Sequence, residues 1–401
     1  MNILFITLVK IGSIAERGIY PDLLRKFVKE GHNVTIVTPI ERRYNESTKL
    51  YQDNGATILR VKTFNVLKTN IIEKGIGTLA IEYQYLSAIK KYLKNTKFDL
   101  VLYSTPPITF VKVIKFVKNR DSAFSYLLLK DIFPQNAVDM KMLKKDGVLH
   151  KMFLKKEKKL YEISDAIGCM SQANVDYVLT HNPEIDRNKV EINPNSIEPV
   201  EFSYSQDETE NIRQKFNLPL NKKIFVYGGN LGRPQGIGFL LETIENCKNE
   251  NVHFLVVGDG TEFNNTQTWF NLKKPENATL LRGLKKSDYD TLLGSCDVGL
   301  VFLDKNFLIP NFPARTLSYL EMKMPIITAT DPNTDVGDIV EKANCGRKVI
   351  SGDLNFMLST IDNILKEDLN VLGENSLKLL YDSYLVDRSY NTIINRINKY
   401  V

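Results

Sequence analysis

The feature that most constrains the fold is an alternation of short apolar runs with stretches of helical periodicity, which occurs twice along the chain. In the first half the runs are NILFITL, HNVTIVTP, ATILRV, FDLVLYST, AFSYLLL and DAIGCMS. In the second half they are KKIFVYGG, VHFLVVGDG, TLLRG, DVGLVFL and PIITAT. Continuous apolar strands separated by helices are typical of a parallel sheet that is covered on both faces. We therefore predict an α/β protein of two Rossmann-like, doubly wound domains that face each other across a deep cleft.

The alternation weakens at a polar, acidic stretch over residues 198–215, and this sets the predicted domain boundary. We predict an N-terminal domain over 1–199 and a C-terminal domain over 200–382, and 401 residues suffice for both. The last segment, 383–401, has the pattern of an amphipathic helix. No apolar run approaches the roughly 18–20 residues of a membrane span. The first run lacks a basic segment before it and a cleavage site after it, so we expect a buried strand and a cytoplasmic protein.

Three turns in the second half follow strands, where open α/β sheets bind ligands. In YGGNLGRPQGIG, glycines let the backbone approach a ligand, and Arg233 offers a planar fork suited to phosphate. VVGDGTEF is a second turn, of a kind common in proteins without ligands. In FPARTLSYLEMK, Pro313 suits the first helical position, so the amides of residues 314–316 are predicted to be unpaired and free to bind an anion. The three turns together indicate a phosphate site.

The order of GGNLGRPQG, VVGDG, LRGLKKSDYD and FPARTLSYLEMKMPIITAT resembles the nucleotide-sugar domain of retaining glycosyltransferases of the GT-B fold. It is most similar to the WbuB-like and capsular polysaccharide branch of family 4. In the first half, KDIFPQNAVDM, SDAIGCMSQAN and INPNSIEP resemble further elements of that branch. The resemblance covers essentially the whole chain. It implies a C-terminal domain that binds a nucleoside-diphosphate sugar, often UDP-linked, an N-terminal domain that receives the acceptor, and a return of 383–401 to the N-terminal domain.

The substrate-binding residues that we predict combine these turns with the family pattern. They are Gly12, Gly229, Asn230, Gly232, Arg233, Gln235, Gly258, Asp259, Leu284, Lys305, Ala314, Arg315, Thr316, Ser318 and Glu321.

The chain departs from the family at two places. Asn230 and Gln235 stand where the wider family has an Arg and a Lys that bind the diphosphate. Pro310 and Ser318 stand where the family has two glutamates, the second of which usually binds the ribose hydroxyls. Glu321 lies about 60° around the helix from Ser318. It either replaces the missing carboxylate or is a solvated helix residue, and the second role is favoured.

The resemblance implies retaining transfer in which the acceptor hydroxyl attacks the face that the nucleotide leaves, so positioning and charge stabilisation carry the catalysis. Relatives often keep a histidine after the strand AFSYLLL, and KDIF stands there in this chain. Asp131 is therefore the candidate catalytic residue, with a turn or helix-capping role as the alternative. Asp288 and Asp290 form a D-x-D at the start of a surface helix, and we expect no metal and no cofactor besides the donor.

Residues 141–160 carry eight lysines against Asp146 and Glu157. Such a segment can lie on an anionic membrane, be a solvated helix, or bind nucleic acid. Because acceptors in the family are often polyprenyl-diphosphate-linked saccharides, we favour a peripheral position at the inner face of the membrane and expect no nucleic acid.

Two other functions stay open at this point. A noncatalytic partner subunit of an active transferase is suggested by the neutral residues at 230, 235 and 318. A sugar-nucleotide 2-epimerase needs acid–base groups, and the presence of only four histidines argues against it.

Overall fold

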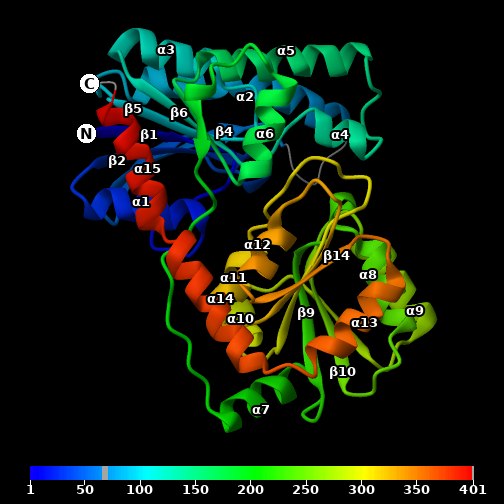
Figure 1. Cartoon of the computed structure of the whole chain (residues 1–401). Coiled ribbons are helices and arrows are strands. Elements are labelled where there is room, and N and C mark those ends of the chain that lie inside the picture. The colour runs from blue at the N-terminus through cyan, green and yellow to red at the C-terminus, as the bar shows by residue number, and fades with distance from the viewer. Residues whose placement is uncertain (66–70, 400–401) are drawn as a thin grey trace. The chain divides into compact units, whose positions relative to one another are not determined.

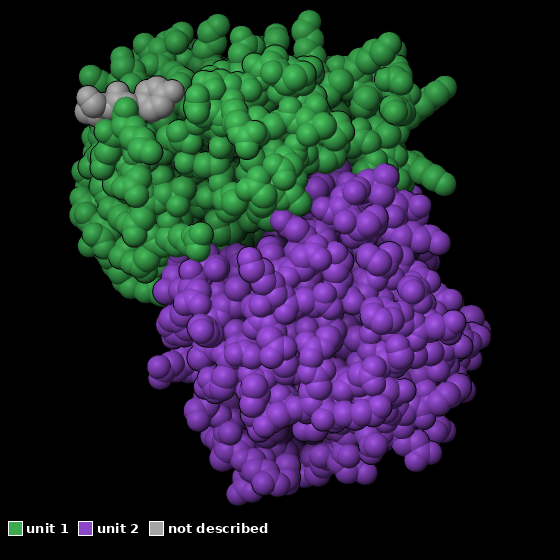
Figure 2. All heavy atoms as spheres, viewed as in Figure 1, with its two compact units in different colours: residues 1–198, 386–401 green, residues 199–385 purple. Residues whose placement is uncertain are grey.

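The computed structural model describes residues 1–65 and 71–399, which form two compact α/β units. Residues 1–198 and 386–401 make up the first unit, and residues 199–385 the second (Figures 1 and 2). The last helix, α15 (Val386–Asn398), thus belongs to the first unit, where it packs on α1. There, the ring centroids of Tyr390 and Phe27 lie 5.0 Å apart. Ser389 also donates a hydrogen bond of 2.6 Å to Asn193.

The first unit is built on an eight-stranded sheet of order β3-β4-β2-β1-β5-β6-β7-β8. All neighbours pair in parallel except β3 and β4. The strands are β1 (Asn2–Ile6), β2 (Asn33–Glu41), β3 (Lys49–Asp53), β4 (Ala56–Thr63), β5 (Leu100–Ser104), β6 (Phe124–Leu129), β7 (Ala166–Cys169) and β8 (Val190–Ile192). The helices are α1 (Ile19–Lys29), α2 (Ile71–Tyr92), α3 (Val111–Asp121), α4 (Gln135–Asp139), α5 (Val148–Ile163) and α6 (Gln172–His181), with 3₁₀ turns η1 (Arg42–Tyr44) and η2 (Arg187–Lys189).

The second unit has a six-stranded parallel sheet of order β11-β10-β9-β12-β13-β14. The strands are β9 (Lys223–Asn230), β10 (Val252–Asp259), β11 (Ala278–Arg282), β12 (Val298–Phe302), β13 (Ile326–Thr330) and β14 (Gly346–Ile350). The helices are α7 (Gln206–Lys215), α8 (Ile237–Asn246), α9 (Phe263–Lys273), α10 (Lys286–Leu293), α11 (Arg315–Glu321), α12 (Val336–Lys342), α13 (Leu354–Ile364) and α14 (Leu369–Ser383), with the 3₁₀ turn η3 (Arg233–Gln235).

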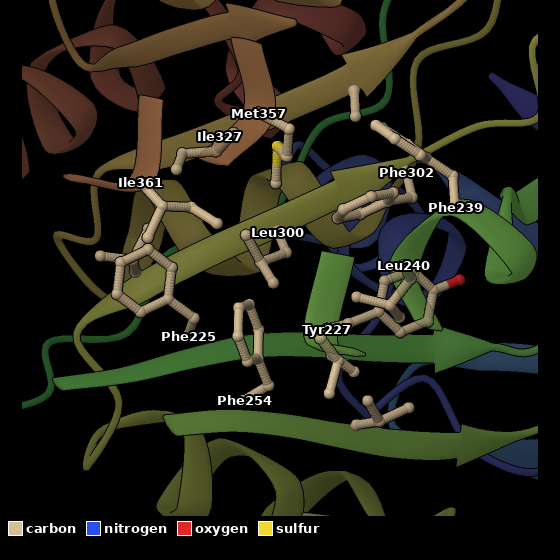
Figure 3. Packing of buried hydrophobic residues seen from close by; sticks show 14 of the residues in the cluster. Phe225, Tyr227, Phe239, Leu240, Phe254, Leu300, Phe302, Ile327, Met357 and Ile361 are labelled. Atoms are coloured by element: carbon tan, nitrogen blue, oxygen red, sulfur yellow. The ribbon is translucent and has the colours of Figure 1, made fainter. Parts of the chain in front are cut away.

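The core of the second unit explains why its inner strands β9, β10, β12 and β13 are largely apolar. On one face of the sheet, buried side chains from four strands pack against α13 (Figure 3). They come from Phe225, Phe254, Leu300 and Ile327 of the strands and from Met357 and Ile361 of the helix. A parallel sheet that is covered on both faces has no solvent-facing side and therefore no polar alternation.

The strand order fixes where a ligand can bind in the second unit. The chain adds β10 and β11 on one side of β9 and then returns to place β12 on the other side. The strand order therefore reverses between β9 and β12, and a crevice at such a point lies outside the carboxyl ends of the strands.

Two further findings concern membrane-spanning helices and the cysteines. In residues 1–65 and 71–399 no helix is both long and apolar enough to cross a membrane. The cysteines are free thiols, three of them buried and Cys296 partly buried.

Candidate functional site

The loops that follow β9 and β12 meet at the point where the strand order reverses. The backbone N–H of Asp304 donates a hydrogen bond of 2.9 Å to the carbonyl of Pro234. Gly236 has φ +60°, and a Cβ added there would lie 2.8 Å from the carbonyl of Leu303. Position 236 therefore requires glycine, both for its left-handed backbone and for the close approach of the two loops.

The centre of the site is Arg315, the first residue of α11. Its guanidinium carbon lies 4.4 Å from the centroid of the Tyr227 ring, which comes from β9. Its Nη2 donates a hydrogen bond to Oε1 of Gln235. Arg315 is partly buried, and among the described residues its buried Nη1 has no hydrogen-bond partner. A cationic nitrogen that is buried without a partner is costly, so Nη1 is a candidate position for an anionic ligand.

Next to Arg315 lie the backbone of Gly229 and the hydroxyl of Thr316. Gly229 has φ +118°, and a Cβ at this residue would lie 3.9 Å from the guanidinium of Arg315. The absence of a side chain at Gly229 leaves the loop backbone accessible next to the guanidinium. Oγ1 of Thr316 is buried and, like Nη1 of Arg315, has no hydrogen-bond partner within residues 1–65 and 71–399. Both groups can donate hydrogen bonds to an oxyanion.

Tyr319 holds α11 against β9 and so positions Arg315. Its hydroxyl accepts a hydrogen bond of 3.0 Å from the backbone N–H of Gly228 and donates to the carbonyl of Val226 at 3.1 Å. Burial raises the pKa of Tyr319, so the hydroxyl stays protonated. Tyr227 and Tyr319 were not predicted as site residues, because each lies within an apolar pattern that equally fits a core position.

Two features of the predicted helix N-terminus are wrong. Pro313 does not occupy the first helical position, since α11 begins at Arg315 with Ala314 as its N-cap. The amide of Thr316 is not free, because it donates a hydrogen bond of 3.0 Å to the carbonyl of Pro313. Leu317 bonds in the same way to Ala314 at 3.1 Å, so the first turn is a tight 3₁₀-type turn. An anion would therefore be held mainly by side chains at this end of α11.

The other residues of the predicted phosphate loops lie at the same edge of the sheet. The side chain of Arg233 is 60% exposed and approaches Glu262 at 3.7 Å. Asp259 pairs with Arg282 at 3.2 Å. The register of β9 and β10 sets Gly229 against Gly258 and Asn230 against Asp259.

The remaining predicted positions lie in the loops after β9, β11 and β12. Gly232 lies beside Asn230, since a Cβ at Gly232 would be 2.9 Å from its Nδ2. Leu284 is half-buried in the segment between β11 and α10. Lys305 is exposed in the loop after β12, and its Cδ lies 3.4 Å from where a Cβ of Gly352 would be.

Ser318 and Glu321 have different surroundings, although both belong to α11. Ser318 is half-buried. Glu321 is 5% exposed, and its carboxylate accepts a hydrogen bond of 2.8 Å from the backbone N–H of Val200. The expectation that Glu321 is a solvated helix residue is therefore wrong, because this carboxylate fixes the segment that enters the second unit.

Two predicted residues belong to the first unit. The carbonyl of Gly12, in the loop after β1, accepts a hydrogen bond of 2.9 Å from the hydroxyl of Tyr51. Asp131 follows β6, and both of its carboxylate oxygens accept hydrogen bonds of 2.9 Å from Nδ2 of Asn136. Burial raises the pKa of Asp131 to about 6, against the opposing effect of these hydrogen bonds. The geometry suits a turn aspartate, and the catalytic role of Asp131 stays a prediction.

Residues 208–378 match the family of glycosyl transferases group 1. This match includes the two loops and the whole of α11. The chain is also similar to "Probable glycosyltransferase WbjE" of Pseudomonas aeruginosa, with 23% identity over 319 aligned residues. The alignment covers 79% of this chain and 78% of WbjE.

Solved structures of low sequence identity share the whole fold. Sucrose-phosphate synthase from Thermosynechococcus elongatus superimposes with a TM-score of 0.76 at 15% identity, over 99% of this chain and 98% of that chain. Anabaena HepE in complex with UDP-glucose gives a TM-score of 0.71 at 12% identity over 100% of both chains. The predicted GT-B fold of two Rossmann-like units is thus confirmed, and the family match supports a glycosyltransferase.

Proposed function

We propose that this chain is a retaining glycosyltransferase of the WbuB-like branch of family 4. It moves a hexosyl or N-acetylhexosaminyl group from a UDP-linked donor to a lipid-linked saccharide in bacterial surface polysaccharide synthesis, without a metal ion. The observation that carries the proposal is the buried Nη1 of Arg315 at the carboxyl edge of the sheet, which has no hydrogen-bond partner in residues 1–65 and 71–399. A nucleoside diphosphate supplies the missing acceptor, and UDP-glucose in the similarly folded HepE supports a UDP-linked donor.

In the proposed reaction the bond between the sugar carbon and the diphosphate oxygen breaks while negative charge grows on the diphosphate. Arg315 is preorganised for this charge, because the Tyr227 ring and Gln235 hold its guanidinium in place before the donor arrives. Thr316 offers a second donor group beside it. The acceptor hydroxyl attacks on the face that the diphosphate leaves, and the leaving diphosphate takes its proton.

The acceptor side of the proposal concerns the first unit. Asp131 is proposed to contact the acceptor hydroxyl or a donor hydroxyl in its ionised form. The lysine-rich segment 141–160 is proposed to keep this unit at an anionic membrane surface, where a polyprenyl-diphosphate-linked acceptor would be found.

Calorimetric titration with UDP, followed by an assay for UDP release from a panel of UDP-sugars, tests the proposal. We expect UDP to bind and at least one UDP-sugar to be turned over. A failure of UDP and all related nucleotides to bind would overturn the donor site. Nucleotide binding without turnover of any donor, in the presence of lipid-linked acceptors, would instead favour the noncatalytic partner subunit.

A further inference from the structure

The loop that follows β1 is fixed beside an arginine of β4 in the first unit. Oγ1 of Thr38 on β2 donates a hydrogen bond of 2.8 Å to the carbonyl of Val9 and accepts one of 3.0 Å from the N–H of Ile11. The sheet register sets Thr38 against Arg60 of β4. Nη2 of Arg60 would lie 3.1 Å from a Cβ at Gly12. The guanidinium of Arg60 therefore borders this loop at the carboxyl edge of the sheet, where open α/β sheets bind ligands.

Arg60 is held in place, but its guanidinium is incompletely partnered. Its side chain is 16% exposed, and its guanidinium carbon lies 5.6 Å from the centroid of the Tyr51 ring. Its Nε is buried and has no hydrogen-bond partner in residues 1–65 and 71–399. Its one ion contact there joins Nη1 to the carboxylate of Glu46 at 3.6 Å, which is too long for a hydrogen bond. This guanidinium therefore retains donor groups for an oxyanion.

Two lysines share Glu46 with Arg60. Lys49 lies opposite Arg60 in the register of β3 and β4, and its Nζ lies 2.7 Å from the Glu46 carboxylate. The hydrogen bond from Lys49, together with the charges of Lys49, Arg60 and Lys10, lowers the pKa of Glu46. Lys10 itself forms no ion pair in the part of the chain that the structure describes. Three cations thus surround one carboxylate that is already hydrogen-bonded.

The other acidic side chains of these loops do not neutralise the three cations. Glu41 forms an ion pair of 2.5 Å with a neighbouring arginine. Asp53 accepts two hydrogen bonds from the loop after β1. Glu16 lies beside Gly12, but among the described residues it forms no ion pair with Arg60. Even with Glu16 and the shared glutamate both ionised, the three cations leave an excess of positive charge that attracts an anion.

An exposed aromatic ring lies next to these cations. Tyr44 belongs to η1, directly after β2, and is 52% exposed. Nζ of Lys10 lies 4.6 Å from the centroid of its ring. Val9, the residue before Lys10, is 47% exposed. A ligand with an anionic group and a flat, apolar face can therefore contact the cations and the ring together.

A sugar that carries a carboxylate or a phosphate has both features, because the C–H groups of a sugar ring form an apolar face. Nucleic acids also combine rings with phosphates, but nonspecific single-strand sites use a row of aromatic side chains along a basic groove. Among the described residues of these loops, Tyr44 alone presents an exposed ring. The arrangement therefore favours a short, acidic saccharide.

We propose that Lys10, Tyr44 and Arg60 form a subsite for an acidic sugar of the acceptor, with the anionic group on Lys10 and Arg60 and the sugar ring on Tyr44. The assignment to the acceptor rests on the proposed function. A carboxylate would belong to the saccharide itself, whereas a phosphate would join its first sugar to the lipid. In either case the subsite selects for negative charge beside a sugar ring.

Ligand-observed NMR on the full chain, in the presence of excess UDP, tests the subsite with three matched probes. They are methyl glucuronide, glucose 1-phosphate and the neutral methyl glucoside. At least one anionic probe should bind about 10-fold more tightly than methyl glucoside. Tighter binding of methyl glucuronide assigns the anion to a carboxylate of the glycan. Tighter binding of glucose 1-phosphate assigns it to the phosphate of the lipid linkage.

Variants of the two cations test which groups hold the anion. Arg60→Gln should weaken binding of the preferred anionic probe roughly 10-fold or more and leave methyl glucoside binding unchanged. Because Arg60 is partly buried, Lys10→Gln repeats the test at an exposed position, with an expected loss of about two- to fivefold. The matched control Lys94→Gln removes an exposed lysine from the loop before β5, at the opposite edge of the same sheet. It should bind all three probes like the wild type.

Variants of the aromatic ring test the contact with the sugar. Tyr44→Ala should weaken the binding of all three probes, including the neutral one. Tyr44→Phe should bind them like the wild type, because the ring and not the hydroxyl makes the proposed contact. A loss confined to the anionic probes in Tyr44→Ala would contradict the part assigned to the ring.

Two results would overturn the proposal outright. They are equal binding of anionic and neutral probes by the wild type, and wild-type affinity for the anionic probes in both Lys10→Gln and Arg60→Gln. Tighter binding of a single-stranded oligonucleotide than of either anionic sugar, with the same dependence on Arg60, would replace the saccharide by a nucleic acid. UDP calorimetry on the same variants separates this subsite from the donor site. Lost discrimination between sugars with normal UDP binding refutes the subsite alone, whereas anionic-sugar binding by a chain that does not bind UDP refutes the donor site alone.

Discussion

Removal of the Arg315 guanidinium is the sharpest test of the donor site. Its Nη1 is buried and unpartnered within the part of the chain that the structure describes, so a bound diphosphate would receive at least one charge-assisted hydrogen bond from it. Such a bond contributes about 1.5–3 kcal/mol. Arg315→Ala should therefore weaken UDP binding by roughly 10-fold to 150-fold.

Arg233→Ala is the matched comparison, because it removes the same group from the neighbouring loop. Its side chain is 60% exposed and already lies 3.7 Å from Glu262. Exposed ion contacts are worth at most about 1 kcal/mol, so we expect a loss of less than about fivefold. Calorimetric titration with UDP measures both dissociation constants under one set of conditions. Equal losses for the two variants, or no loss for Arg315→Ala, would refute the assignment of Arg315 as the main cation.

Gln235→Glu separates a charge effect from a folding effect at the same place. The change keeps the shape of the side chain but sets a carboxylate against Nη2 of Arg315, where Gln235 Oε1 now accepts a hydrogen bond. The guanidinium then has a counter-ion, so UDP should bind at least 10-fold more weakly while the free energy of unfolding stays the same or rises. Weaker UDP binding together with a less stable protein would point to damage of the fold.

Three further perturbations test other parts of the structure. Gly236→Ala should lower the free energy of unfolding in urea by at least about 2 kcal/mol, because φ is +60° and the new Cβ would lie 2.8 Å from the Leu303 carbonyl. Gly238→Ala is the control and should be neutral or stabilising, because a Cβ at this position would meet no neighbouring described residue within 4 Å. Ser318→Glu should fold and bind UDP at least as tightly as the wild type in calorimetry, and lost binding at an unchanged melting temperature would show that the site needs a small residue. The Asp131 carboxyl has its pKa raised from 3.8 to about 6 in the fold, so its contribution to stability falls as the pH rises from about 4 to about 6. Asp131→Asn cannot titrate at this position, so its free energy of unfolding in urea should fall less than that of the wild type across that pH window. An identical fall in both proteins would contradict the raised pKa of the Asp131 carboxyl.

The alternation of apolar runs was sufficient to predict both sheets, because strands covered on both faces are apolar nearly throughout and are separated by helices of amphipathic pattern. The edge strands β3, β8 and β14 were missed for the complementary reason, and β8 is only the three residues VEI. The residues of β3, KLYQD, are mostly exposed, and GRKVI of β14 carries two cations, so neither forms an apolar run. An edge strand forms because its neighbour offers hydrogen bonds, and that information lies elsewhere in the chain.

The donor site shows the same division between local and distant information. Glycine spacing and strand order predicted which loops would carry the proposed site, and the family pattern suggested Arg315 as one of its cations. The environment of Arg315 could not be predicted, because Tyr227 and Gln235 lie 80 or more residues away in sequence. The role of Glu321 was missed for the same reason, since its partner is the backbone of Val200.

These distant contacts change the meaning of the departure from the family at position 235. A lysine there, as in the wider family, would set a second cation against Arg315 in a partly buried place, at an energetic cost. Gln235 instead accepts a hydrogen bond from Nη2, and Nη1 has no partner among the described residues. The neutral residue thus orients the guanidinium of Arg315. A chain that had lost donor binding would gain nothing from a cation whose buried nitrogen lacks such a partner, so Gln235 favours the proposed donor site over a noncatalytic partner subunit.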